Sequence, residues 1–215
     1  MILIMAAAVV APHLLWAQRL ITDLHPADNS YGRRPTIVLW RGLDGATRSR
    51  NRSDCSSFMT ALLRRAYGLT HDDIRDWLGH SSPRAADYHQ AILRSDRFQK
   101  IASVADLRPG DLLVSRYRFP RPGATGPMML LADWPQPVGR CSKSVCLFRL
   151  AVIDSSRSGH GWTDTRKGQG GAGRGFIQIK TSIDGMLVTY RWSERRSSRW
   201  RSTVHESLIA GRFSW

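Results

Sequence analysis

The sequence is short of acidic residues. It holds 17 aspartates and glutamates against 32 lysines and arginines, which leaves a formal net charge of +15. A surface with so few carboxylates attracts polyanions such as nucleic acid, anionic lipid headgroups or acidic cell-wall polymers, and charge alone does not choose among them. A solvated basic face without a specific partner is the alternative.

Cysteine is also scarce, with three in the chain: Cys55, Cys141 and Cys146. In an oxidising compartment Cys141 and Cys146 can close a short loop, which would leave Cys55 as a free thiol. Zinc binding by this pair is the rival interpretation, but no second Cys or His pair stands nearby at ligand spacing. We therefore expect no metal site.

No apolar run is long enough to be a plain membrane span. The longest candidate, residues 1–17, has no Asp, Glu, Lys or Arg but is interrupted by Pro12 and His13, and a bilayer needs about twenty apolar residues. Its end, Leu15-Trp16-Ala17, is typical of a small-residue cleavage site. We predict a signal peptide over 1–17 and a secreted or cell-envelope protein, with no transmembrane span after cleavage. An uncleaved anchor and a wrongly assigned start codon are the alternatives.

Internal repeats and long linkers are absent, so residues 18–215 are expected to form a single domain. Apolar residues from Phe58 to Ala66 recur at helical spacing, Ser53 or Asp54 can cap the N-terminus of this helix, and Gly68 can end it.

Two more helices are expected, over 70–78 and 81–93. Ser82 would cap the second of these, with Pro83 at its first position.

Strand signals dominate the rest of the chain. Asp184-Gly185 is a strong hairpin turn between two of the expected strands. The predicted strands are 36–40, 112–119, 128–132, 148–156, 175–183, 186–192 and 207–213. Because helices precede antiparallel strands, the order predicts an α+β fold with N-terminal helices packed on one face of an antiparallel β-sheet.

Cys55 is expected in the first turn of its helix. There the positive end of the helix dipole and the free backbone N–H groups favour the thiolate, which is the nucleophilic form. Asp54 opposes this effect unless its carboxylate is occupied as a cap. A lone cysteine at a helix end is more often inert, so its partners decide its role.

Two motifs together resemble the NlpC-type cysteine peptidases and amidases of the papain-like superfamily. These are Asp-Cys-Ser-Ser-Phe (54–58) at the start of a helix and Leu-x-Pro-Gly-Asp-Leu-Leu (107–113) at the start of a strand. The resemblance covers roughly residues 50–160. It implies a papain-like NlpC-type domain and a secreted hydrolase of amide bonds in cell-wall peptide. Cys55 would be its nucleophile, and backbone N–H groups at the helix start would stabilise the oxyanion.

The resemblance assigns further residues one by one. Asp111 matches the Asp of the Pro-Gly-Asp turn, and Asp154 matches the polar residue that orients the base. The family's histidine position, in a Gly-His-Val-like strand start, reads Gly126-Pro127-Met128 in this chain. Proline cannot act as a base, and general acid–base help is typically worth about 10²–10⁴-fold. An unassisted thiol, with a pKa near 8.5, is mostly protonated at neutral pH.

His160 is the expected substitute base, because it follows Asp154 by six residues and its flanking glycines permit a close approach. An ordinary loop histidine is the alternative. His89 is the second candidate, although a histidine on a helix surface is the commoner interpretation. The other histidines have no supporting context: His13, His25, His71, His80 and His205.

The sequence therefore predicts a secreted thiol hydrolase in which Cys55, Asp154 and His160 are catalytic. The alternative is a catalytically inactive NlpC-like domain that binds an anionic envelope polymer, and Pro127 favours it. In either case the expected partner is peptidoglycan or another anionic envelope polymer. An exported protein meets little nucleic acid, so nucleic acid is not an expected partner.

Two basic segments remain. The glycine-rich string 164–175 precedes a strand instead of joining a strand to a helix, so it is no dinucleotide loop and no cofactor is expected. A flexible surface loop is the default for it, with Arg166, Lys167 and Arg174 able to contact an anion. The segment 191–200 interleaves Trp192 and Trp200 with arginines, a pattern that can bind single-stranded nucleic acid or a glycan. Alternation on a solvent-facing strand explains the same residues, and we favour that explanation.

Overall fold

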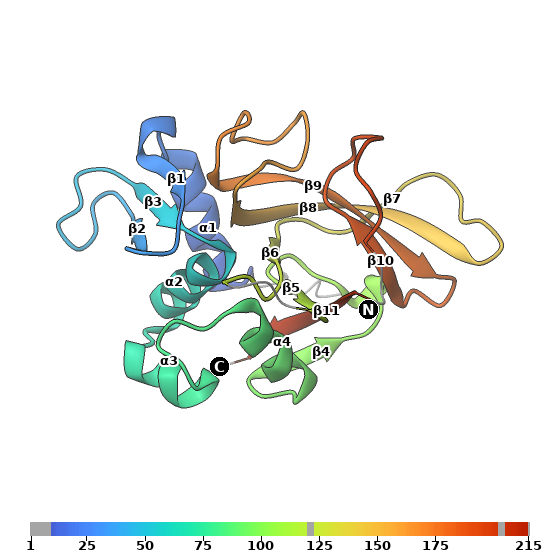
Figure 1. The fold of residues 1–215 in the computed structure, drawn as a ribbon, viewed down its shortest axis with the longest axis horizontal. Coiled ribbons are helices and arrows are strands. Elements are labelled where there is room, and N and C mark those ends of the chain that lie inside the picture. The colour runs from blue at the N-terminus through green and yellow to red at the C-terminus, as the bar shows by residue number, and fades with distance from the viewer. Residues whose placement is uncertain (1–9, 120–122, 202–204, 215) are drawn as a thin grey trace, which may run out of the picture.

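The chain has a mixed α+β fold in the computed structural model, which describes residues 10–119, 123–201 and 205–214 (Figure 1). The predicted order is confirmed, because helices precede a large antiparallel sheet. The helices are α1 (Pro12–Asp23), α2 (Cys55–Tyr67), α3 (His71–Leu78) and α4 (Ala85–Leu93), and 3-10 turns span Pro26–Asp28 and Val104–Asp106.

The strands form two sheets. A small sheet has the order β1-β3-β2, with β1 parallel to β3 and β2 antiparallel to it. The large sheet has the order β10-β9-β8-β6-β5-β11-β4 with antiparallel neighbours, and β7 pairs with β8 beside it. The bounds are β1 (Asn29–Tyr31), β2 (Ile37–Leu39), β3 (Arg50–Ser53), β4 (Phe98–Ile101), β5 (Leu112–Tyr117), β6 (Met128–Leu131), β7 (Gln136–Pro137), β8 (Val145–Ser156), β9 (Gly171–Ser182), β10 (Leu187–Arg191) and β11 (Glu206–Phe213).

The large sheet is buried on both faces where it meets the helices. Ala151 and Ile153 of β8 join the hydrophobic cluster formed by α1, α2, α3 and α4. Leu150 and Val152, which point the other way, join a second cluster that the strands supply almost alone. Figure 1 shows β8 ending and β9 starting beside α1 and α2, while the other ends of both strands extend past the helices. The sheet therefore has a helix face and an opposite face, each with its own core.

Local capping explains where the helices begin. At α2, Asp54 is the N-cap and its Oδ1 accepts the Ser57 N–H at 2.8 Å, while Gly68 ends the helix in a left-handed conformation with φ 69°. The prediction for the third helix is wrong at its start, because α4 begins at Ala85.

The reason lies in two competing contacts at α4. The carboxylate of Asp87 accepts the backbone N–H of Arg84 at 2.7 Å, which makes Arg84 the N-cap. Ser82, the predicted cap, instead accepts hydrogen bonds from Arg33 through its carbonyl oxygen and its Oγ.

The first helix includes part of the predicted signal peptide. Pro12 to Ala17 form the first half of α1, and His13, Leu14 and Ala17 are buried. His13 contacts Tyr67 Oη through Nδ1 at 2.8 Å and the carbonyl oxygen of Gly110 through Nε2 at 2.7 Å. Residues 1–9 of that segment lie outside the described residues. Signal cleavage stays a prediction, and cleavage after Ala17 would cut this buried helix in two.

A disulfide joins Cys141 and Cys146 in the hairpin that leads into β8, and Cys55 is a free thiol. Over the described ranges, no group of three or more His, Cys, Asp or Glu side chains could hold a metal ion. Nor is any helix in these ranges long and apolar enough to cross a membrane.

Candidate functional site

Cys55 is the first residue of α2, and its side chain packs against the helix-face core. Its Sγ lies 3.9 Å from the carbonyl oxygen of Gly126, the residue before Pro127. Pro127 stands where the resemblance expects a histidine, and its carbonyl oxygen accepts the N–H of Ser115 at 2.9 Å. The group that the thiol contacts just before β6 is therefore a backbone carbonyl and not a base.

The surroundings of Cys55 favour its protonated form. Burial raises the pKa of the Cys55 thiol to about 12, and the negative charges of Asp54 and Asp154 act in the same direction. Backbone hydrogen bonds from Met128 and Ser56 act against this but do not overcome it. The helix N-terminus therefore does not activate this cysteine.

Asp54 keeps its charge although it serves as the cap. Burial alone would raise the pKa of Asp54, but hydrogen bonds from Ser57 and Arg33 hold it below its usual value. The Nη1 of Arg33 lies 2.8 Å from Asp54 Oδ2. The residue beside the thiol is thus a carboxylate whose charge is balanced by an arginine.

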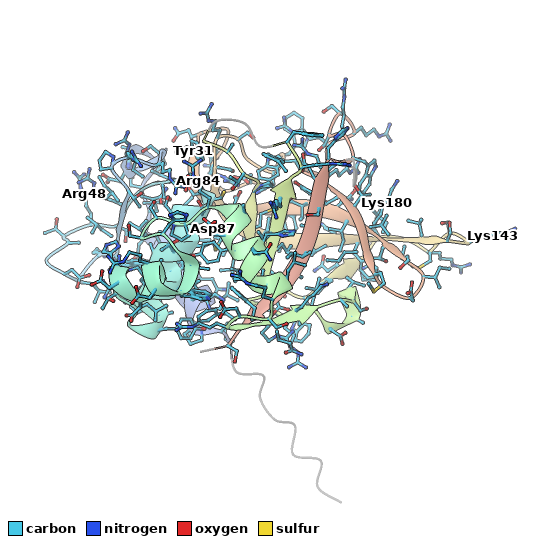
Figure 2. The ribbon with its side chains drawn as sticks, turned by 60° about the horizontal axis from the view of Figure 1, so that its bottom comes forward. Tyr31, Arg48, Arg84, Asp87, Lys143 and Lys180 are labelled. Carbon is cyan, nitrogen blue, oxygen red and sulfur yellow. A yellow bond between two sulfur atoms is a disulfide. The ribbon has the colours of Figure 1, made fainter. Side chains whose placement is uncertain are left out.

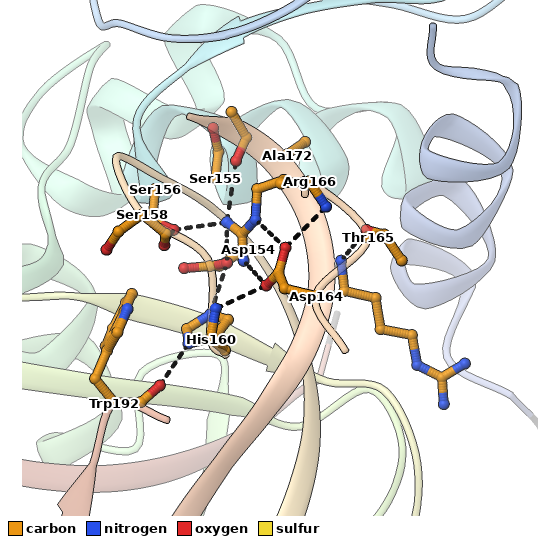
Figure 3. Close-up of polar contacts among 12 residues, drawn as sticks. Asp154, Ser155, Ser156, Ser158, His160, Asp164, Thr165, Arg166, Ala172 and Trp192 are labelled. Carbon is orange, nitrogen blue, oxygen red and sulfur yellow. Dashed lines mark hydrogen bonds and ion pairs between the residues drawn. The ribbon is translucent and has the colours of Figure 1, made fainter. Parts of the chain in front are cut away.

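Asp154 and His160 lie in contact, as the sequence predicted for a base and its orienting residue (Figure 3). His160 Nε2 is 2.9 Å from Asp154 Oδ1, and Nδ1 is 2.9 Å from the carbonyl oxygen of Trp192. Both side chains are completely buried. Since both ring nitrogens face oxygen acceptors, neither is directed at Cys55.

The large sheet stands between His160 and Cys55. Asp154 shares its face of β8 with Leu150 and Val152, because alternate residues of a strand point the same way. Ser155 points to the helix face, where its Oγ donates to the carbonyl oxygen of Ser53 at 2.7 Å.

The ring contacts of His160 also place it on the opposite face of the large sheet from Cys55. The His160 ring packs on Trp192 with 4.3 Å between ring centroids, and Trp192 belongs to the core of the opposite face. Cys55 belongs to the helix-face core. The structure therefore brings Asp154 and His160 together but does not bring His160 to the thiol.

Arg166 occupies the centre of the same buried cluster (Figure 3). Its Nη1 donates to Asp154 Oδ1 at 2.8 Å and to Ser156 Oγ at 2.6 Å, and its Nη2 donates to Asp164 Oδ2 at 2.6 Å. Burial alone would raise the pKa of Asp154, but the charges of His160 and Arg166 hold it below its usual value. The expectation that Arg166 lies in a flexible surface loop is wrong, because its guanidinium is fully buried among these partners.

The glycines of the basic string have a packing role that sequence reasoning missed. A Cβ at Gly175 would lie 2.4 Å from Asp164 Oδ2 and 2.7 Å from His160 Cβ. A Cβ at Gly173 would lie 2.6 Å from Arg166 Cγ. Both glycines are in β9, directly opposite Val152 and Asp154 of β8. The available signal was the period-two Gly-x-Gly-x-Gly of residues 171–175, which marks a strand face covered closely by other chain.

Asp111 and His89, two further residues that the sequence singled out, are both buried and hydrogen-bonded. Asp111 is buried, and its carboxylate pairs with Arg212 of β11 at 2.9 Å, which ties the Pro-Gly-Asp turn to the sheet. His89 is buried and not on a helix surface, with its Nε2 2.8 Å from Ser207 Oγ. Burial, together with the charges of Arg116 and Lys100, lowers the pKa of His89 to about 4.

A pocket of about 540 Å³ lies next to the Cys55 site, and arginines dominate its lining. Arg33 connects the two, because its Nη1 contacts both Asp54 and Ser56. Arg34 and Arg84 form no ion pair with any described residue, so their charges are available to a ligand. The lining residues are Arg33, Arg34, Arg75, Gly79, His80, Ser81, Ser82, Arg84, Asp87 and Thr125. We call this the arginine pocket.

Comparison with known proteins finds a relative in a giant virus. The uncharacterised protein R653 of Acanthamoeba polyphaga mimivirus is 29% identical over an alignment of 215 positions, which covers 93% of this chain and 95% of the relative. No family model matches the chain, and no solved structure matches it. The chain is thus similar, over nearly its whole length, to a viral protein whose name gives no activity.

Proposed function

We propose that this chain is an NlpC-like domain without thiol-hydrolase activity, which binds an anionic polymer in the arginine pocket beside Cys55. One observation carries the proposal: the thiol has a carbonyl where a base is needed, and a pocket that Arg33 connects to Asp54 and Ser56 presents several arginines. A nucleophilic cysteine needs a lowered pKa or an adjacent base. The pKa of Cys55 is raised to about 12 instead.

The NlpC-like assignment is supported by the arrangement of the two motifs. Cys55 opens α2, and α2 packs against the sheet that contains β5, β6 and β8. The Leu107–Asp111 turn leads directly into β5, which pairs with β6 just after Pro127. The motif residues of the resemblance thus meet around one sheet, with proline at the position of the base.

Anion binding is supported by the balance of charge in the pocket. Arg33 is occupied by Asp54, and Arg75 lies 2.9 Å from Asp72, but Arg34 and Arg84 have no such partner among the described residues. Asp87 is the sole carboxylate in the described lining, and it accepts the backbone N–H of Arg84. Guanidinium groups suit carboxylate and phosphate ligands. That the polymer belongs to a cell envelope is a separate proposal, which depends on export.

The proposal is tested by binding of inorganic polyphosphate and of poly-L-glutamate to the full chain. We expect Arg34→Gln/Arg84→Gln to weaken binding of at least one polymer by roughly tenfold or more, since hydrogen bonds to charged groups are worth about 1.5–3 kcal/mol each. Cys55→Ser should bind like the unchanged protein, because the thiol has no role in binding.

A matched control removes two charges elsewhere. Arg140→Gln/Lys143→Gln changes the net charge equally, and both side chains are exposed in the hairpin that leads into β8. Equal weakening by the two double variants would mean that only net charge matters, and it would refute the arginine pocket as a site.

A further inference from the structure

Three strands carry basic and aromatic side chains on one face. Arg149 of β8 is opposite Gln178 of β9, and Gln178 is opposite Arg191 of β10, so these residues share a face. Phe176 and Lys180 lie two residues either side of Gln178 and point the same way. The opposite face of β9 holds Ile177 and Ile179 in the second core. We call Arg149, Phe176, Gln178, Lys180, Arg191 and the adjoining Trp200 the basic–aromatic face.

Cations lie over the rings of this face. The guanidinium carbon of Arg149 is 3.4 Å from the centroid of the Phe176 ring. Lys180 Nζ is 4.4 Å and the guanidinium carbon of Arg191 is 5.2 Å from the centroid of the Trp200 ring. Figure 1 shows β9 and β10 extending past the helices, and Figure 2 shows Lys180 well away from them. Phe176 packs against the edge of the helix-face core, so the face continues that side of the sheet beyond the helices.

Trp162, in the loop between β8 and β9, is a freely exposed ring that the segment after β10 links to this face. Its side chain is 86% exposed, and the guanidinium carbon of Arg195 lies 4.2 Å from its ring centroid. Glu194, the neighbour of Arg195, pairs with Arg149 at 2.7 Å, which connects Trp162 to the basic–aromatic face. Arg195 also lines a pocket of about 360 Å³ with Ser158, Gly159, Gly161, Gly168 and Ser193.

We propose that this surface binds single-stranded nucleic acid, with bases stacked on Trp162 and Trp200 and phosphates paired with Lys180 and Arg195. Exposed aromatic rings stack unpaired bases of any sequence, and cations between them follow the backbone. A neutral glycan would use the rings but leave the cations without partners. A duplex offers no unstacked base to Trp162. The net charge of +15 adds long-range attraction for such a polyanion.

This surface is separate from the arginine pocket, so the inference does not rest on the function proposed above. Export is what would keep nucleic acid away from the chain. The buried contacts of His13 and Leu14 in α1 argue that residues 12–17 remain part of the folded protein.

The test measures fluorescence anisotropy of a labelled oligodeoxythymidylate of about 15 nucleotides, a length that suits such sites, with the full chain. Trp162→Ala should weaken binding at least about fivefold, because stacking on one base is worth about 1–3 kcal/mol. It should not disturb the fold, since the ring is 86% exposed. Lys180→Gln/Arg195→Gln should reduce the slope of log affinity against log salt by about 0.7 for each lost contact.

Two controls separate stacking from bulk charge. Arg41→Gln/Arg48→Gln removes the same charge elsewhere, from exposed side chains between β2 and β3, and Figure 2 shows Arg48 at the opposite end of the molecule from Lys180. It should lower affinity less than Lys180→Gln/Arg195→Gln. An abasic oligonucleotide of equal length should bind more weakly than the thymidylate and be insensitive to Trp162→Ala.

Three results would overturn the inference. One is unchanged thymidylate affinity in Trp162→Ala, and another is equal affinity for the abasic strand. The third is tighter binding of neutral chitohexaose than of the thymidylate, which would assign the rings to a glycan.

Discussion

Arg166 holds two carboxylates inside the protein, at 2.8 Å from Asp154 and 2.6 Å from Asp164. Replacing it with glutamine leaves two buried carboxylates without the guanidinium that they share. Removing one member of a buried ion pair costs about 3–5 kcal/mol. We therefore expect Arg166→Gln to lower the free energy of unfolding by roughly that amount in urea denaturation.

The neighbouring residue supplies the control for this prediction. Lys167 is exposed in the same loop, so Lys167→Gln should change the free energy of unfolding by less than about 0.5 kcal/mol. Equal stability of the two variants would mean that the cluster around Arg166 is not formed in solution.

At the scale of single residues, the sequence predicted that Asp154 and His160 lie close together. It did not predict that Cys55 lies on the other face of the large sheet. The spacing of Asp154 and His160 and the flanking glycines indicated their contact, and the structure has it at 2.9 Å. Strand alternation also grouped Asp154 with Leu150 and Val152. Which face α2 covers is set by distant contacts, such as Ser155 with Ser53, and no local pattern carries that information. The base role of His160 is therefore a prediction that would require its loop to leave a buried site.

At the scale of elements, α1 provides the sharpest prediction, because neighbouring leucines differ in burial. Leu14 is 1% exposed and Leu15 is 52% exposed. Leu14→Ala should reduce the free energy of unfolding by about 2–5 kcal/mol, whereas Leu15→Ala should change it by less than about 1 kcal/mol. Chemical denaturation of both variants is the measurement. Similar stabilities would mean that α1 does not pack in the core, and this would favour removal of the segment as a signal.

The ends of an element were predictable where local capping sets them. They were less predictable where contacts with distant parts of the chain set them. Asp54 and Gly68 bound α2 as expected, because capping is a local property. At α4 the Ser82-Pro83 signal was equally local, but Arg33 recruits Ser82 from 49 residues away. β9 begins at Gly171, inside the string expected to be a loop, because its glycines pair with β8 and leave space for Arg166.

At the scale of the whole molecule, basic side chains occur at both ends. Figure 2 shows Arg48 at one end and Lys143 at the other. Composition therefore predicted attraction for polyanions but could not locate a site. The arginine pocket and the basic–aromatic face differ in chemistry: the first has guanidinium groups and no Phe, Tyr or Trp in its lining, and the second offers cations with aromatic rings. Variants of each should leave the other ligand's binding essentially unchanged.

The central claim is that Cys55 is not an activated nucleophile. Its direct test is the rate of iodoacetamide alkylation of Cys55 against pH, in Cys141→Ser/Cys146→Ser protein and in the same protein unfolded in urea. Only the thiolate reacts, so the rate follows its titration. Because burial and the charge of Asp54 raise the pKa to about 12, the folded protein should react slowly at pH 7–9, with a rate still rising at the highest pH tolerated. The unfolded chain should titrate near 8.5. An apparent pKa below about 8.5 in the folded protein, lost in His160→Ala, would contradict the account and restore the thiol hydrolase.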